Sequence, residues 1–159
     1  RKTVTQKTER LVLSQYIFGG TWLKKDYQFI QMQKIARQVL QRIEEERGLT
    51  ITIEGHTDIV GVKAGNVRIS NRRAEAAAVS LIRYIGLLKG LDSTEAIRDF
   101  LNNRNCQIRT RGYGSEKPYE VIRYQQDKFY REIIGDNSEP EGRVINRRVE
   151  ILLEVQSVK

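Results

Sequence analysis

A carboxylate and a guanidinium flank one predicted loop of this sequence. Asp58 stands at the tip of a predicted strand, and Arg72 and Arg73 stand in the predicted first turn of the helix beyond the loop. The helix macrodipole disfavours each cation there by about 0.3–1 kcal/mol. A positive charge beside free helix N–H groups nevertheless makes an anion site. One anionic and one cationic group on a rigid scaffold therefore suit a zwitterionic ligand.

Hydrophobic periodicity predicts the elements that position these two groups. Residues 49–54 alternate apolar and polar, which is the period of a half-buried strand, and Gly55 ends the alternation. A glycine-containing loop follows. From Ser70 to Ile85 apolar residues recur at helical spacing, so a helix is expected to begin at Ser70.

Five further segments complete the predicted fold. A first strand is expected over residues 11–18, and a long amphipathic helix over residues 27–47. A capping box predicts a short helix over residues 92–101. Residues 107–111 read as a short strand, and residues 148–155 alternate as a half-buried strand. Clean alternation favours a sheet that helices cover on one face only.

Three blocks of the sequence resemble the OmpA-like peptidoglycan-binding domains, in identity, order and spacing. The first block carries the motif Gly-His-Thr-Asp, and the residues at several later positions also agree with the family pattern. The blocks are Gly55-His56-Thr57-Asp58 with Asn66, Ile69-Ser70 and Arg73-Ala74, then Gly112 to Pro118, then Asn146-Arg147-Arg148-Val149-Glu150. The family includes outer-membrane porin tails, peptidoglycan-associated lipoproteins and flagellar stator subunits.

The resemblance implies an α+β fold of order β-α-β-α-β-β, with a mixed parallel and antiparallel four-stranded sheet. Helices are expected on one face of that sheet. Residues 1–9 are then a linker remnant and residues 10–157 the domain. Two helical or loop insertions are expected at about 87–105 and 119–142, the second as a short helix plus a mobile loop.

The resemblance also implies a ligand and the residues that hold it. The ligand is the diaminopimelate of the peptidoglycan stem peptide. By resemblance, Asp58 takes its ammonium and Arg73 its carboxylate, through a bidentate contact. Asn66 and the backbone around Thr57 supply further hydrogen bonds, and Arg147 borders the pocket.

Catalysis, metal binding and cofactor binding are not expected. His56 is the single histidine and Cys106 the single cysteine, and this pair alone does not make a metal site. No nucleophile is placed beside His56, so a catalytic triad is not indicated. His56 is predicted to be a structural residue near the pocket rim. A wall hydrolase would need a second placed carboxylate beside Asp58.

The expected function is non-enzymatic anchoring of an envelope membrane protein to the cell wall, in the periplasm. No run of about 18 apolar residues occurs, so membrane contact is expected only through an upstream segment. Two settings stay open: an outer-membrane anchor, or a stator-like inner-membrane motor subunit, which would imply a homodimer. The net charge of +8 raises nucleic-acid binding as an alternative, but nucleic acid is not the expected partner.

Overall fold

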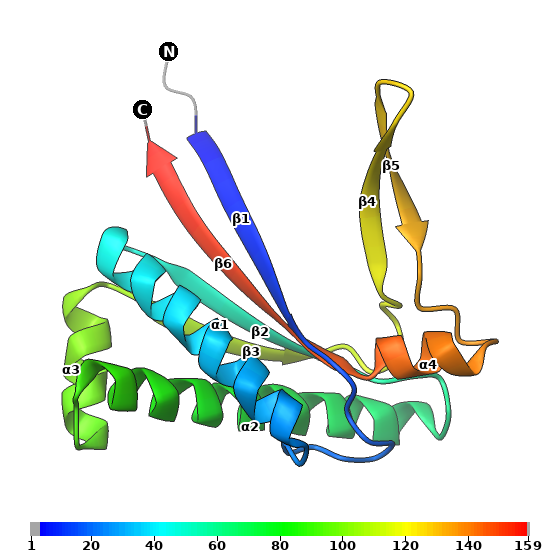
Figure 1. The fold of residues 1–159 in the computed structure, drawn as a ribbon, viewed down its shortest axis with the longest axis horizontal. Helices are drawn as coiled ribbons and strands as arrows, with labels where there is room; N and C mark the ends of the chain where they lie inside the picture. The colour runs from blue at the N-terminus through cyan, green and yellow to red at the C-terminus, as the bar shows by residue number, and fades with distance from the viewer. Residues whose placement is uncertain (1–3, 159) are drawn as a thin grey trace.

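The computed structural model describes residues 4–158, and these form one four-stranded sheet, one separate hairpin and four helices (Figure 1). In chain order the elements are β1 (Val4–Leu13), α1 (Asp26–Glu45), β2 (Thr50–His56), α2 (Lys63–Lys89), α3 (Thr94–Asn103), β3 (Gln107–Gly112), β4 (Glu120–Gln125), β5 (Lys128–Ile133), α4 (Pro140–Asn146) and β6 (Arg148–Val158). The sheet has the order β1-β6-β2-β3. β2 and β3 are parallel, whereas β6 is antiparallel to both β1 and β2. The predicted mixed sheet is confirmed.

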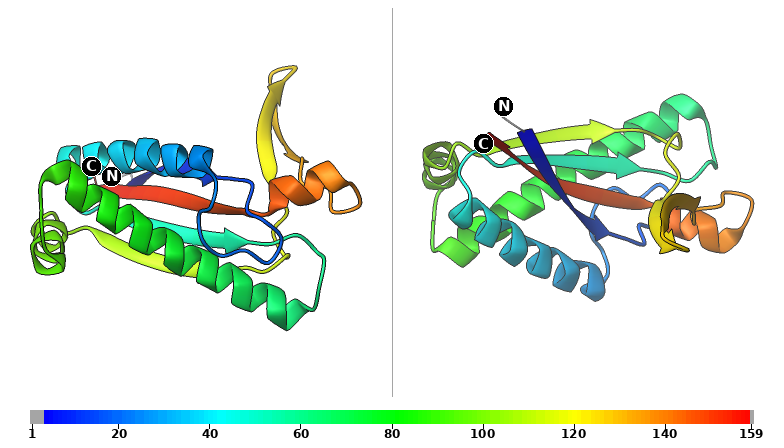
Figure 2. Two further views of the ribbon diagram at one scale, coloured as in Figure 1. Left: turned by 60° about the horizontal axis from the view of Figure 1, so that its bottom comes forward. Right: turned by 90° about the horizontal axis from the view of Figure 1, so that it is seen from above.

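The two long helices, α1 and α2, cover one face of this sheet and leave the other face open (Figure 2). β2 and β6 alternate as predicted, and their inward residues Ile51, Ile53, Ile151 and Leu153 are fully buried against α1 and α2. The parallel pairing of β2 and β3 requires a long crossover, which α2 and α3 provide. Within residues 4–158, no helix is long and apolar enough to cross a bilayer.

β1 is displaced from its predicted position. The prediction placed it at residues 11–18, but it runs over Val4–Leu13 and pairs with β6 along its whole length. The predicted linker over residues 1–9 is therefore wrong from Val4 onward, and residues 1–3 lie outside the described residues. The physical reason is that β6 is 11 residues long, and its backbone N–H and C=O groups take their partners from this polar segment.

α2 begins at Lys63, seven positions before the predicted start at Ser70. Its first two turns contain the buried polar residues Asn66 and Ser70, so the apolar pattern does not mark them as helix. Arg72 and Arg73 consequently lie well inside the helix. Their predicted role beside free N–H groups of the first turn is wrong, because those groups are found at Lys63 and its neighbours.

The segment expected as the first insertion contains a helix, as predicted, whereas the segment expected as the second insertion is mainly a hairpin. α3 is capped by Ser93, whose Oγ accepts the Ala96 N–H at 3.0 Å. Residues 120–133, predicted as a helix, form the hairpin β4–β5, which projects from the open side of the sheet (Figure 1). Its two turn residues, Gln126 and Asp127, both have positive φ, as a two-residue turn of type I′ requires. α4 begins within the predicted mobile loop and continues beyond it to Asn146.

The closest approach between the sheet and α2 yields a test of the fold. Gly55 in β2 lies against the backbone of α2, and a Cβ there would overlap the carbonyl oxygen of Ser70. We expect Gly55→Ala to lower the free energy of unfolding by roughly 3 kcal/mol, because backbone cannot yield as a side chain does. Gly65→Ala is the control, since its Cβ would meet only Val62 Cγ2 at 4.0 Å. Urea denaturation of both variants measures this, and equal stability would contradict the close packing.

Candidate functional site

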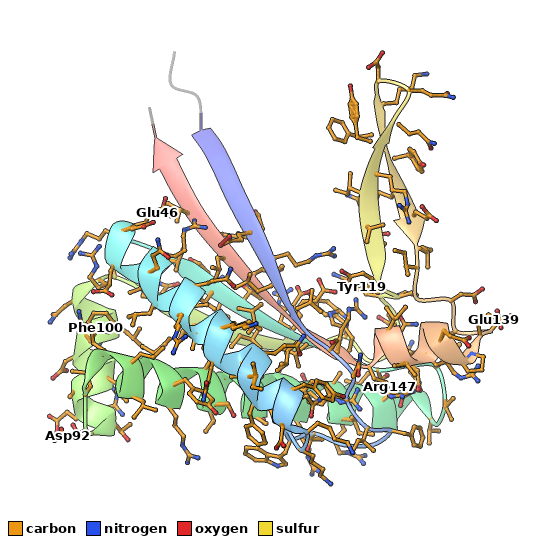
Figure 3. All side chains as sticks on the ribbon, in the orientation of Figure 1. Glu46, Asp92, Phe100, Tyr119, Glu139 and Arg147 are labelled. Atoms are coloured by element: carbon orange, nitrogen blue, oxygen red, sulfur yellow. The ribbon has the colours of Figure 1, made fainter. Side chains whose placement is uncertain are left out.

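The five predicted site residues meet at one end of the sheet. Thr57 and Asp58 follow β2, Asn66 and Arg73 belong to α2, and Arg147 links α4 to β6. All five line one cavity, together with Phe18, Gly19 and Ile69. Its volume is only about 10 Å³, which barely admits one water molecule. Figure 3 labels Arg147 at this end, where α4 passes into β6.

Asp58 is buried and its charge is balanced inside the protein. Its side chain is 3% exposed, and Oδ2 accepts a hydrogen bond from Arg147 Nη1 at 2.9 Å. Oδ1 accepts the Val60 N–H at 3.0 Å, which holds the turn after β2. Arg147 also donates from Nε to the Tyr16 carbonyl oxygen at 2.7 Å. The carboxylate thus has a cation as partner already, without any ligand.

Arg73 is the largest fully buried side chain among the described residues, at 1% exposure. Its guanidinium donates to three backbone carbonyl oxygens: from Nε to Gly20 at 2.6 Å, from Nη1 to His56 at 2.7 Å and from Nη2 to Ile17 at 3.1 Å. It also lies 5.1 Å from the ring centroid of Tyr16. Burial lowers the pKa of Arg73 to about 10, so the group stays charged at neutral pH.

Thr57 and Asn66 hold the backbone around Asp58. Thr57 Oγ1 donates to the Asp58 carbonyl oxygen at 2.9 Å, and the Thr57 N–H donates to the Gly114 carbonyl oxygen at 2.8 Å. Asn66 Nδ2 reaches the Asp58 carbonyl oxygen at 3.4 Å. Ser70 contributes as well, since its Oγ accepts the Gly114 N–H at 2.9 Å. These bonds tie the first two motif blocks together.

The loop between β1 and α1 covers the site, which the sequence did not predict. Phe18 and Gly19 line the cavity, and the carbonyl oxygens of Ile17 and Gly20 bind Arg73. Phe18 is itself 57% exposed. The predicted strand over residues 11–18 includes part of this loop, and the glycine pair Gly19-Gly20 follows it directly. That glycine pair was the available signal for a loop, but nothing in it indicates that its carbonyl groups bind Arg73.

The two residues considered for metal binding differ in their surroundings. Cys106 belongs to the main core, and burial raises the pKa of its thiol to about 11. His56 presents its carbonyl oxygen to Arg73, while its ring lies on the open face of the sheet beside Glu54 and Glu150. Burial lowers the pKa of His56. Glu54 and Glu150 were not predicted as neighbours of His56. The alternation of Glu54 and His56 along one strand was a signal that could have linked two of the three.

Comparisons with known proteins agree on one family. The OmpA family model matches residues 18–128. Outer membrane porin F of Pseudomonas aeruginosa is 32% identical over 106 residues, which are 67% of this chain and 21% of the porin. The chain thus spans about a fifth of the length of that relative.

Two solved structures share the fold. The first is the periplasmic domain of Helicobacter pylori MotB (residues 97–256), with a TM-score of 0.58 and 18% identity over 92% of this chain and 80% of that one. The second is the peptidoglycan-associated lipoprotein of Burkholderia pseudomallei, with a TM-score of 0.54 and 20% identity over 89% of this chain and 88% of that one. At these identities the likeness establishes the fold alone.

The buried pair of Asp58 and Arg147 predicts strong energetic coupling. We expect Arg147→Gln to lower the free energy of unfolding by about 3 kcal/mol, because it leaves the buried carboxylate of Asp58 without its partner. Asp58→Asn should lower it by less, because the side chain of Arg147 is 18% exposed. The double variant should lose about 1–3 kcal/mol less than the sum of the two. Urea denaturation of the four proteins measures this.

A matched control is the exposed ion pair of Lys63 and Glu116, whose side chains are 78% and 59% exposed at an N–O distance of 3.1 Å. The same cycle with Lys63→Gln and Glu116→Gln should give a coupling energy below about 1 kcal/mol. Additive effects at Asp58 and Arg147, equal to those of the control pair, would contradict the buried ion pair.

Proposed function

The chain belongs to the OmpA family, and on this premise we propose that it binds peptidoglycan through the diaminopimelate of the stem peptide. By this contact it anchors an envelope membrane protein to the cell wall. One observation carries the proposal: Asp58 and Arg73 from one strand-loop-helix unit and Arg147 from a distant part of the chain surround a single cavity. A carboxylate between two guanidinium groups matches the ammonium and carboxylate that diaminopimelate carries at one carbon atom.

The ion pair of Asp58 and Arg147 supports a binding mechanism in which the charged groups of the ligand replace this internal contact. A zwitterion can replace this pair without leaving a buried charge alone, because its ammonium pairs with Asp58 while its carboxylate pairs with a guanidinium. Arg147 is the more accessible guanidinium, with 18% of its side chain exposed. Arg73 becomes available only when the loop that carries Ile17 and Gly20 moves away from it.

Opening of that loop is therefore part of the proposal. A cavity of about 10 Å³ cannot hold the end of a diaminopimelate side chain, so Phe18 and Gly19 must shift for the ligand to bind. Two of the three carbonyl partners of Arg73 belong to this loop, and the carboxylate of the ligand can take their place. The third partner, the carbonyl oxygen of His56, stays in β2 and keeps Arg73 in position.

We propose a binding module rather than an enzyme. Among the described residues that line the cavity, Asp58 is the one that carries a carboxylate. Glycoside hydrolysis requires two carboxylates about 5–9.5 Å apart across the bond that breaks. The lining of this cavity thus suits recognition of a charged group better than cleavage of a glycan.

The cellular setting that we propose is the periplasm, with attachment to the outer or the inner membrane through a region outside this sequence. The relatives named above include an outer membrane porin and a periplasmic domain of MotB. An outer-membrane anchor and a stator-like motor subunit both remain compatible with the fold. Dimerisation is a further expectation for the second setting.

Calorimetric titration with a diaminopimelate-containing stem peptide tests the proposal. A peptide with lysine in place of diaminopimelate is the comparison, because it keeps the ammonium and lacks the carboxylate. We expect the diaminopimelate peptide to bind at least about 10-fold tighter, the equivalent of one charged hydrogen-bonded contact. Asp58→Asn should weaken binding of both peptides by about 10-fold or more, whereas Arg73→Lys should mainly remove the preference between them.

Asp92→Ala and Arg98→Ala are the matched controls, since both residues are exposed and lie outside the cavity. These variants should bind both peptides as the parent chain does. Equal affinity of the parent chain for the two peptides would contradict recognition of the carboxylate. Affinity that falls steeply with salt for any polyanion would favour nucleic-acid binding instead.

A further inference from the structure

The imidazole of His56 is buried without a hydrogen-bond partner. The residue is 1% exposed, and among the described residues neither Nδ1 nor Nε2 has a partner of hydrogen-bond geometry. Buried polar side-chain atoms nearly always have a partner, which can be a protein group, a water molecule or an ion. A buried ring with two unsatisfied nitrogens at the end of a central strand therefore points to a ligand.

Two carboxylates lie beside this ring on the open face of the sheet. Nε2 of His56 is 3.5 Å from Glu54 Oε1 and 3.9 Å from Glu150 Oε2, and the three ligand atoms all lie within 4.8 Å of one another. Glu54 in β2 stands directly opposite Glu150 in β6. Like charges at directly opposed positions destabilise an antiparallel pair, so this arrangement favours a cation between them.

We propose that Glu54, His56 and Glu150 bind a divalent transition-metal ion, with Zn²⁺ as the best match. One imidazole nitrogen and two carboxylate oxygens are a mixed ligand set of the kind that Zn²⁺ accepts, with a water molecule in the fourth position. Bonds of about 2.0–2.1 Å in a tetrahedron place the ligand atoms about 3.3 Å apart. The two distances from His56 exceed this by a few tenths of an ångström, and all three atoms lie within 4.8 Å of one another, so metal binding would draw the two carboxylates together through side-chain shifts.

Two arginines lie beside Glu150, and their positive charge opposes the binding of a metal ion. Arg148 donates from Nε to Glu150 Oε2 at 2.6 Å, and Arg10 Nη1 lies 3.5 Å from Oε1. Arg148 is fixed by two further bonds, to the carbonyl oxygens of Asn146 and Lys117. Hydrogen bonds of this type orient a ligating carboxylate. Their positive charge also weakens the attraction for a cation, so we expect micromolar rather than nanomolar affinity.

A cavity of about 450 Å³ adjoins the three residues and leaves room for the remaining ligands of the metal. Its walls include Lys117 and Pro118 and the hairpin residues Glu120 and Ile133. This cavity lies apart from the one around Asp58, and the two share no lining residue. A metal here would fix the end of β2 to β6 at the position where the His56 carbonyl oxygen accepts Arg73.

Titration of the chain with Zn²⁺ in a calorimeter, and with Co²⁺ in a spectrophotometer, tests the site. We expect one ion per chain, a visible absorption band of Co²⁺ bound to nitrogen and oxygen, and a rise in Tm of about 5 °C at 100-fold excess over Kd. Glu54→Gln and His56→Gln should each weaken binding by at least about 10-fold. Glu54→Gln decides the matter if His56→Gln fails to fold, because Glu54 is less buried.

Two control variants separate this site from other sources of binding. Glu120→Gln removes a carboxylate from the wall of the same cavity, and Cys106→Ser removes the single thiol. Both should bind Zn²⁺ as the parent chain does. No binding by the parent chain at millimolar Zn²⁺, or equal binding by Glu54→Gln, would overturn the proposal. Neither readout depends on peptidoglycan binding.

Discussion

The burial of one guanidinium, that of Arg73, organises this end of the molecule. A charged group can be buried only if its donors are satisfied, and here three backbone carbonyl groups satisfy them. Those carbonyl groups belong to the loop between β1 and α1 and to the end of β2. The side chain of Arg73 therefore connects α2 to the loop between β1 and α1 and to the end of β2. Asp58 is placed correctly because the strand that precedes it is held in this way.

The ion pair of Asp58 and Arg147 explains how a carboxylate can be buried at this end of the sheet. An isolated buried carboxylate is costly, and a guanidinium from the start of β6 offsets that cost. The same pair keeps the cavity small. The zwitterionic ligand that we propose carries both charges that the pair brings together, so on this proposal it replaces the contact at little electrostatic cost. Its affinity would then depend mainly on the free energy needed to move the covering loop.

Successive side chains of β2 point alternately to the two faces of the sheet. Ile51 and Ile53 point into the core, whereas Glu54 and His56 point to the open face, where Glu150 meets them. The hairpin β4–β5 stands above that face with large apolar side chains exposed; Ile122 is 67% and Phe129 74% exposed. Its base is fixed by Asn146, whose Oδ1 accepts the Tyr119 N–H and whose Nδ2 donates to the Gly135 carbonyl oxygen, both at 2.8 Å. Asn146 immediately precedes Arg147, so one short segment positions both the hairpin and the ion pair.

The sequence by itself determined the strands β2 and β6 and the two covering helices, because alternation and the stripe of α1 depend only on which neighbours are apolar. The mixed sheet and most of the residues that gather around Asp58 came from the resemblance of three sequence blocks to a family, and not from periodicity. The prediction misplaced the start of α2, since Asn66 and Ser70 are buried for their hydrogen bonds, and it mistook the β4–β5 hairpin for a helix. Only the tertiary structure decided that Arg73 is enclosed by carbonyl groups, that Arg147 pairs with Asp58 and that Glu150 joins Glu54 and His56. Each of these contacts joins segments far apart in the chain, and local periodicity carries no information about which distant charges a fold brings together.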